Sequence, residues 1–98
     1  MKYIHNKLTN RFFRAVLNLN SVDECERFFE DICTIKEIQD MSQRLEVAYL
    51  LNEGKSYQEV LAKTGVSTAT ISRVNKCLNY GSGGYKETIE KLSKTEEE

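Results

Sequence analysis

The sequence contains no proline and only five glycines among its 98 residues. Proline removes a backbone donor and breaks helices, so its absence leaves long helical stretches uninterrupted. Strict alternation of apolar and polar residues, which is typical of strands, is also rare and favours helices throughout. With 40% hydrophobic and 30% charged residues, the composition fits one globular all-α domain spanning residues 1–98.

Long apolar runs are missing as well. No run approaches the roughly 18 residues that a membrane-spanning helix requires. The first ten residues, MKYIHNKLTN, lack the apolar stretch of a signal peptide. The sequence therefore predicts a cytoplasmic protein that does not engage a membrane.

Groups suited to metal binding or catalysis are scarce. The three cysteines, Cys25, Cys33 and Cys77, show no C-x-x-C spacing, and the single histidine, His5, lies far from any cysteine pair. We therefore expect no metal and no cofactor, and we interpret the cysteines as small buried helix residues. No Ser/His/Asp or Cys/His arrangement is present, and the acids within residues 23–31 resemble a solvated helix face. The sequence does not predict an enzyme.

The net charge of −1 conceals an uneven distribution. Residues 1–20 carry a charge of +4, and residues 21–40 carry −5. Between residues 55 and 80, four bases against one acid give a local charge of +3. This local excess has two interpretations, a nucleic-acid contact and an ordinary scatter of charge on solvated helix faces.

Capping boxes predict several helix starts. A Ser or Thr followed three residues later by Glu satisfies two free backbone N–H groups, and this pattern occurs at Ser21–Glu24, Thr34–Glu37 and Ser56–Glu59. Each box precedes apolar residues at helical spacing. The predicted helices span about residues 9–19, 21–32, 34–53, 56–63, 67–78 and 85–92. Gly54 is expected to end the third helix, and residues 79–84 to form a turn.

The apolar side chains of residues 12–38 exceed what three short helices need to cover one another. They are Phe12, Phe13, Phe28, Phe29, Ile32, Ile35 and Ile38. One explanation is the core of a monomeric bundle. The other is packing against a second copy of the chain, which the small size also favours.

The segment from Ser56 to Leu78, SYQEVLAKTGVSTATISRVNKCL, follows the plan of a helix-turn-helix. The short first helix is predicted to bury Tyr57, Val60 and Leu61, and Gly65 suits the turn because positive φ costs glycine nothing. The second helix carries Ile71, Val74 and Leu78 on its inner face. A structural αα-hairpin and a protein-contact module are the alternatives.

The second helix of this segment begins with small polar residues, which allow close approach to base edges in a DNA major groove. Arg73 and Lys76, one turn further on, can contact phosphates and add salt-dependent affinity. The predicted DNA-contacting residues are Gln58, Ser67, Thr68, Ala69, Thr70, Ser72, Arg73 and Lys76.

The sequence resembles the Trp repressor superfamily, most closely the YerC/YecD branch of Trp-repressor-like proteins. The resemblance is carried by CTIKEIQDMSQRLEVAYLL (33–51), Gly54, SYQEVLAKTGVSTATISRV (56–74) and CLNYGSGGY (77–85). ATISR (69–73) is the most specific segment.

The resemblance implies a six-helix fold that forms an intertwined homodimer, with dimerisation helices at about 9–53 and 85–93 and a helix-turn-helix at about 56–79. The two helix-turn-helix heads would occupy successive major grooves of double-stranded DNA. The half-sites of a pseudo-palindromic operator would then lie about 34–36 Å apart. The implied function is a transcriptional regulator, a repressor that occupies a promoter.

The resemblance also implies where a small effector would bind. In the family, two arginines sandwich the indole of tryptophan, and Arg44 and Arg73 match these positions. The family's glycine after the second arginine is Val74 here, and Cys77 replaces a serine that helps to hold the ligand. A branched side chain is costly to accommodate in a tight aromatic slot. We therefore expect either ligand-independent DNA binding or a different small effector, not tryptophan.

Overall fold

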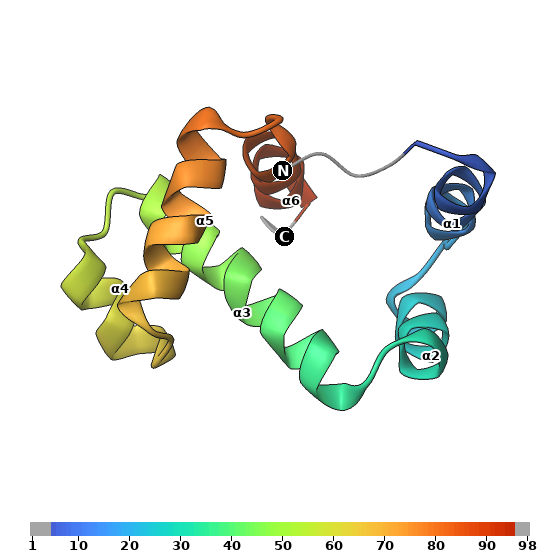
Figure 1. Cartoon of the computed structure of the whole chain (residues 1–98), viewed down its shortest axis with the longest axis horizontal. Coiled ribbons are helices and arrows are strands. Elements are labelled where there is room, and N and C mark those ends of the chain that lie inside the picture. The colour runs from blue at the N-terminus through green and yellow to red at the C-terminus, as the bar shows by residue number, and fades with distance from the viewer. Residues whose placement is uncertain (1–4, 96–98) are drawn as a thin grey trace. The chain divides into compact units, whose positions relative to one another are not determined.

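The computed structural model describes residues 5–95, and within them the chain is all-α, without strands. Six helices follow one another in the described part (Figure 1): α1 Lys7–Leu17, α2 Val22–Ile32, α3 Ile35–Asn52, α4 Tyr57–Thr64, α5 Thr68–Tyr80 and α6 Gly84–Thr95. The predicted all-α, six-helix fold is therefore confirmed. The chain divides into two compact units at residues 38 and 39, inside α3.

Local side-chain hydrogen bonds fix most helix starts. The Thr34 hydroxyl accepts from the Glu37 N–H at 3.0 Å, and the Glu37 carboxylate accepts from the Thr34 N–H at 2.8 Å, so this predicted box is present. Ser21 also caps its helix, but the Glu24 carboxylate accepts from the N–H of Asn20 and not from that of Ser21. A box that was not predicted begins α1, where Asn6 and Thr9 exchange backbone-to-side-chain bonds of 2.9 and 3.1 Å.

The helix ends agree less closely with the predictions. α1 begins and ends two residues earlier than expected, and α6 runs three residues beyond Leu92. α5 continues through Tyr80, so the turn before α6 begins at Gly81 and not at residue 79. α3 ends at Asn52, and Gly54 follows with a φ of 91°, as predicted for a left-handed cap.

The hydrophobic core belongs to residues 39–95 and joins four helices. Its buried members are Val47, Ala48, Leu50, Val60, Ile71, Val74, Leu78 and Ile89. α3 supplies three of them and α5 another three, at the spacing of one helix face. α4 and α6 each add one residue. α5 therefore lies on the core along its whole length, which fixes the direction of its outer face.

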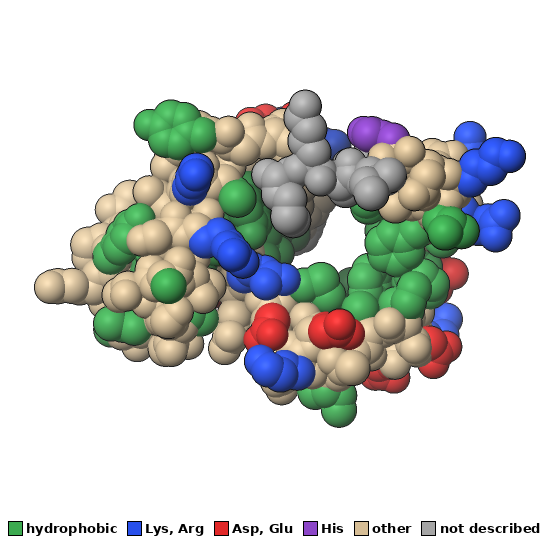
Figure 2. Space-filling model, viewed as in Figure 1, with side chains coloured by type: hydrophobic (Ala, Val, Ile, Leu, Met, Phe, Trp, Pro, Cys, Tyr) green, Lys and Arg blue, Asp and Glu red, His purple; other side chains and the backbone are tan. Residues whose placement is uncertain are grey.

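The unit formed by residues 5–38 has no buried residue in either α1 or α2. Its main internal contact is aromatic: the Phe12 and Phe28 ring centroids lie 6.2 Å apart, and Phe28 meets Phe29 edge-on at 5.4 Å. Both helices are strongly amphipathic, and Figure 2 shows hydrophobic side chains gathered at their surface. The largest exposed apolar side chains of this unit are Leu8, Phe13, Leu17, Val22, Ile32 and Ile35. These helices cannot cover one another's apolar surface.

Two burial predictions are wrong. Tyr57 and Leu61 are 37% and 40% exposed, because the eight-residue α4 directs only Val60 into the core. Cys25 and Cys33 are only half-buried, and Cys77 is exposed. Cys77 neighbours the buried stripe of α5 without belonging to it.

None of the helices in the described residues is both long and apolar enough to cross a membrane. No group of three or more potential metal ligands is found within residues 5–95.

Candidate nucleic-acid interface

The predicted helix-turn-helix consists of α4, a three-residue turn and α5. α4 begins with a capping box in which the Glu59 carboxylate accepts from the Ser56 N–H at 2.8 Å and the Ser56 hydroxyl accepts from the Glu59 N–H at 3.2 Å. The two bonds satisfy donors that the first turn of any helix leaves free. The start of α4 is therefore fixed by residues three positions apart, as the sequence predicted.

The pKa of Glu59 lies below its ordinary value, mainly because the carboxylate accepts hydrogen bonds from Ser56. A carboxyl whose pKa is lower in the folded state stabilises that state above its unfolded pKa. This stabilisation is lost as the pH falls through the folded pKa. Since glutamine can complete a capping box without charge, Glu59→Gln should lower the melting temperature near pH 7, with a difference that shrinks toward pH 3. Thermal melts across this range test the prediction, and a difference that does not change with pH would contradict it.

Gly65 makes the turn between α4 and α5. Its φ is 74°, and its N–H donates to the Leu61 carbonyl at 2.8 Å, which closes α4. No atom lies within 4 Å of where a Cβ would stand, so the left-handed backbone is what favours glycine here. The Thr64 hydroxyl supports the same turn, donating to the Val60 carbonyl at 2.8 Å and accepting from the Val66 N–H.

Ser67 caps α5, as predicted. Its hydroxyl accepts from the Thr70 N–H at 3.2 Å and donates to the Thr70 hydroxyl at 3.1 Å. Ser67 and Thr70 therefore hold the start of the helix, and Thr70 is half-buried. Thr68 and Ala69, between them, are exposed. These two residues place only small side chains on the exposed surface of the first turn of α5.

The outer face of α5 lies opposite the buried stripe of Ile71, Val74 and Leu78. The predicted residues Ser72, Arg73 and Lys76 are all exposed on this helix, and Gln58 is exposed in the first turn of α4. These predicted residues therefore lie on two consecutive helices that contact each other.

Sequence reasoning missed an amide pair further along α5. The Asn79 side-chain N–H donates to both the carbonyl and the side-chain oxygen of Asn75, each at 3.0 Å. The four-residue spacing of two asparagines was the available signal. The pair holds two polar side chains in a fixed arrangement on the second half of α5.

The family resemblance matched four residues to an effector site, Arg44, Arg73, Val74 and Cys77. Val74 is 1% exposed and belongs to the core, whereas Arg44, Arg73 and Cys77 are exposed. The two pockets described next contain none of the four in their walls.

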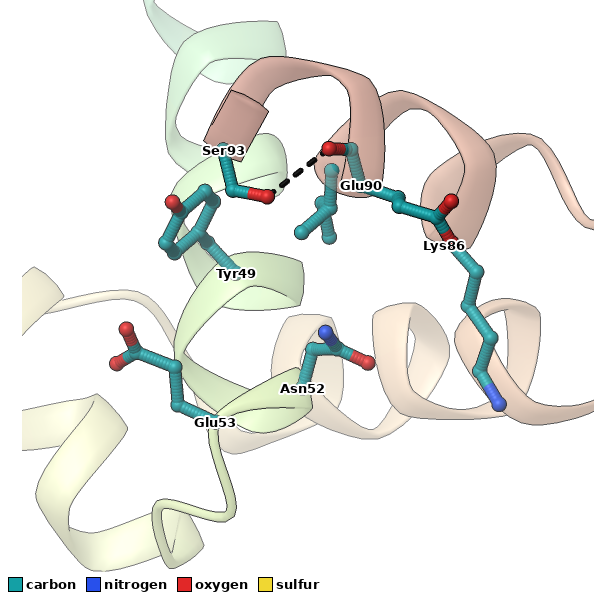
Figure 3. Close-up of a pocket in the computed structure, with 7 residues that line it drawn as sticks. Tyr49, Asn52, Glu53, Lys86, Glu90 and Ser93 are labelled. Atoms are coloured by element: carbon teal, nitrogen blue, oxygen red, sulfur yellow. Dashed lines mark hydrogen bonds between the residues drawn. The ribbon is translucent and has the colours of Figure 1, made fainter. Parts of the chain in front are cut away.

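A second feature lies between α3 and α6 and was not predicted. Two pockets of about 430 and 380 Å³ share Tyr49 and Glu53, and together we name them the α3–α6 groove. Figure 3 shows the larger one, where Ser93 of α6 donates to the Glu90 carbonyl at 2.9 Å and the Tyr49 ring of α3 lies close to that turn. The groove combines apolar walls (Leu45, Tyr49, Ile89, Leu92) with three carboxylates, those of Glu46, Glu53 and Glu90, and one ammonium group, that of Lys86.

Comparisons of the sequence and of the structure with known proteins all find Trp-repressor-like proteins or their relatives. The sequence model of the family described as Trp repressor protein matches residues 7–93. The chain is 47% identical to the uncharacterised protein YerC of Bacillus subtilis over 95 residues, covering 97% of this chain and 91% of that protein. The crystal structure of a TrpR-like protein from Eubacterium eligens superposes with a TM-score of 0.87 at 50% identity, covering 90% and 91% of the two chains. A Staphylococcus aureus crystal structure superposes with the same TM-score at 38% identity, covering 91% and 89%.

Proposed function

The chain belongs to the Trp repressor protein family, and from this premise we propose that it is a sequence-specific DNA-binding transcriptional regulator, a repressor that acts as a homodimer. One observation carries the proposal. α5 is held by its buried side on a core of four helices, while its opposite side offers small and basic residues to a major groove. A helix that is held in place by a core and carries small polar side chains in its first turn can approach base edges closely.

The contacts divide into two kinds. Thr68 and Ala69 lie at the N-terminal end of α5, the part of a recognition helix that enters the groove first, and would contact base edges. Arg73 and Lys76 are exposed one and two turns later, where long basic side chains reach phosphates. Phosphate contacts position the protein, and base contacts give its sequence preference.

The homodimer is supported by the uncovered apolar surface of α1 and α2. A unit without buried residues gains little stability by itself, since apolar burial is the main favourable term in folding. A second copy would cover these faces. The α3–α6 groove offers a matching surface, because its carboxylates oppose the charges of Lys7, Arg11 and Arg14 on α1. Two heads on one dimer would then contact successive major grooves.

The function is tested by fluorescence polarisation with fragments of genomic DNA against random duplexes of the same length. The double variant Arg73→Ala/Lys76→Ala should weaken binding to every sequence and reduce the slope of log K against log salt by about 2, one per lost phosphate contact. Thr68→Val should instead weaken the preferred site by about 5- to 150-fold, the equivalent of 1–3 kcal/mol for one base contact, with little effect on random DNA.

Lys91→Ala, which removes an exposed base from α6, is the matched control and should leave the salt slope unchanged. The proposal fails if the wild-type protein binds genomic fragments no better than random DNA at physiological salt. It also fails if Lys91→Ala and Arg73→Ala/Lys76→Ala behave alike.

A further inference from the structure

Two asparagines on α5 fix the orientation of each other's side-chain amides. The Asn79 Nδ2 donates to the Asn75 carbonyl and to the Asn75 Oδ1, each at 3.0 Å. A backbone carbonyl only accepts hydrogen bonds, so the nitrogen of the Asn79 amide must face Asn75. The same nitrogen then requires the oxygen, and not the nitrogen, of the Asn75 amide to face it. The chemistry of the partners therefore determines both amide orientations.

This arrangement decides which amide donors the pair can offer to a binding partner. An asparagine amide carries two N–H donors and one oxygen acceptor. Both hydrogen bonds of the Asn79 Nδ2 are directed at Asn75, whereas no described residue accepts a hydrogen bond from the Asn75 Nδ2. The donors that remain free in the pair are therefore those of Asn75, whose amide oxygen is held by the next turn of the helix.

The pair lies on the same face of α5 as a residue that the proposed function assigns to DNA. Residues spaced three and four apart fall on one face of an α-helix. Thr68, Ser72, Asn75 and Asn79 follow one another at such spacings, and all four are polar and uncharged. Thr68 is the residue proposed above to contact base edges. The two asparagines therefore continue the proposed DNA-contacting face toward the C-terminal end of the helix.

The position of Asn75 along α5 corresponds to the edge of a major groove. With a rise of about 1.5 Å per residue, Asn75 lies about 10 Å beyond Thr68 along the helix axis. The major groove of B-DNA is about 8.5 Å deep. A helix that enters the groove by its first turn therefore carries Asn75 at the level of the phosphates. The neighbouring Arg73 and Lys76, which are proposed to contact phosphates, flank it in the chain.

We propose that Asn75 is an uncharged phosphate contact at the edge of the groove and that Asn79 is the positioning residue that orients it. The Asn75 N–H groups donate to a phosphate oxygen, and Asn79 holds the amide in the orientation that this bond requires. An amide whose oxygen accepts a hydrogen bond is also a stronger donor through its N–H groups. The inference rests on the proposed function for the contact with DNA and adds to it a contact that carries no charge.

An uncharged donor affects DNA binding differently from a basic side chain. Lysine and arginine release counterions when they neutralise phosphates, and this release makes affinity depend on salt. Asparagine carries no charge and releases none. A phosphate contact also strengthens binding to every sequence, because phosphates carry no sequence information. Loss of the Asn75 contact should therefore weaken binding to all DNA without changing the salt dependence.

The test is fluorescence polarisation of the full chain on genomic fragments and on random duplexes at several salt concentrations. Asn75→Ala should weaken binding to both kinds of DNA by about 10- to 150-fold, the range of one hydrogen bond to a charged group. The slope of log K against log salt should stay at the wild-type value, unlike that of Arg73→Ala/Lys76→Ala. Asn75→Asp keeps an oxygen that accepts from Asn79 but replaces the donors by a carboxylate, so it should bind more weakly than Asn75→Ala.

Asn79→Ala tests the positioning role. It keeps the Asn75 donors but releases their orientation, so affinity for both kinds of DNA should fall by about 2- to 10-fold, the range for immobilising one side chain. In Asn75→Ala/Asn79→Ala the second substitution should add nothing, because no donor remains to be positioned. Independent, multiplying effects of the two substitutions would overturn the role assigned to Asn79.

Two controls separate lost contacts from lost folding. Alanine is a better helix former than asparagine, so the melting temperatures of the alanine variants should stay close to that of the wild type. Asn20→Ala removes an exposed amide between α1 and α2, and it should bind DNA as the wild type does.

The inference is overturned if Asn75→Ala binds random DNA as tightly as the wild type, or if its salt slope falls by about 1, as for a lost basic contact. A loss confined to the preferred DNA would show that Asn75 contacts bases, and this too would overturn it. Failure of the proposed function is a separate result, seen with the wild type as equal affinity for genomic and random DNA. The comparison of Asn75→Ala with the wild type on random DNA would still decide the inference.

Discussion

An Ile71→Ala variant should lose a substantial part of the stability of the unit formed by residues 39–98. Ile71 has no exposed surface and joins α5 to the core beneath the helix-turn-helix. Truncating a buried isoleucine to alanine costs about 2–5 kcal/mol. Domains of this size are stable by only about 5–15 kcal/mol in total. The expected fall in melting temperature is about 10–30 °C, measured by circular dichroism, with DNA binding lost in parallel.

Ser72→Ala is the matched control, because the neighbouring Ser72 is exposed on the same helix. Its melting temperature should stay close to that of the wild type, since surface substitutions usually change stability by less than about 0.5 kcal/mol. Ile71→Val should lie between the two, at a cost of about 0.5–1.5 kcal/mol. A wild-type melting temperature for Ile71→Ala would contradict the description of α5 as held by this core.

A Phe28→Asp variant should sediment as a monomer near 11.3 kDa, whereas the wild type should sediment at twice that mass. Phe28 stands between Phe12 and Phe29 at the centre of the aromatic contact of α1 and α2. A carboxylate there would be left without a partner in the apolar interface proposed between two copies, which is strongly unfavourable. In a monomer, binding of one helix-turn-helix to its half-site no longer holds a second helix-turn-helix near the other half-site. DNA affinity should therefore fall on the order of 10²–10⁴-fold.

Arg27→Asp introduces the same side chain one position earlier, at an exposed residue of α2, and should remain a dimer. The unit with the core, residues 39–98, does not contain Phe28, so the melting transition of that unit should persist in Phe28→Asp. Analytical ultracentrifugation and polarisation on one operator measure both expectations. A dimeric Phe28→Asp with full DNA affinity would contradict the proposed use of these faces.

The features that were predicted correctly depend on residues close together in the chain. The boxes at Thr34 and Ser56 join residues three positions apart, and the Gly65 turn depends on one backbone torsion. Their physics is complete within a few residues, so the sequence is enough. The box at Asn6 was not predicted, because the capping-box pattern requires Ser or Thr followed by Glu or Gln, whereas Asn6 and Thr9 occupy these two positions.

The features that were not predicted depend on which other element of the fold packs against a given helix face. Tyr57 and Leu61 have the spacing of a buried stripe, yet they are partly exposed because no second element covers that side of the short α4. The α3–α6 groove is formed by residues about forty positions apart, and no local pattern indicates that α6 lies across α3 at Tyr49. Hydrophobic periodicity shows which face of a helix is apolar, but not what covers it.

The absence of buried side chains in α1 and α2 has a consequence for the order of folding. Residues 39–98 possess a core of their own, so we expect their folding to be a first-order process whose rate does not depend on protein concentration. α1 and α2 gain stable burial only when two chains meet under the proposed assembly, which makes their ordering second-order. A newly made chain would therefore first fold the half that carries the helix-turn-helix, and it would pair with a second copy only as the protein accumulates. The concentration of the protein in the cell would then itself set the threshold at which an operator is occupied.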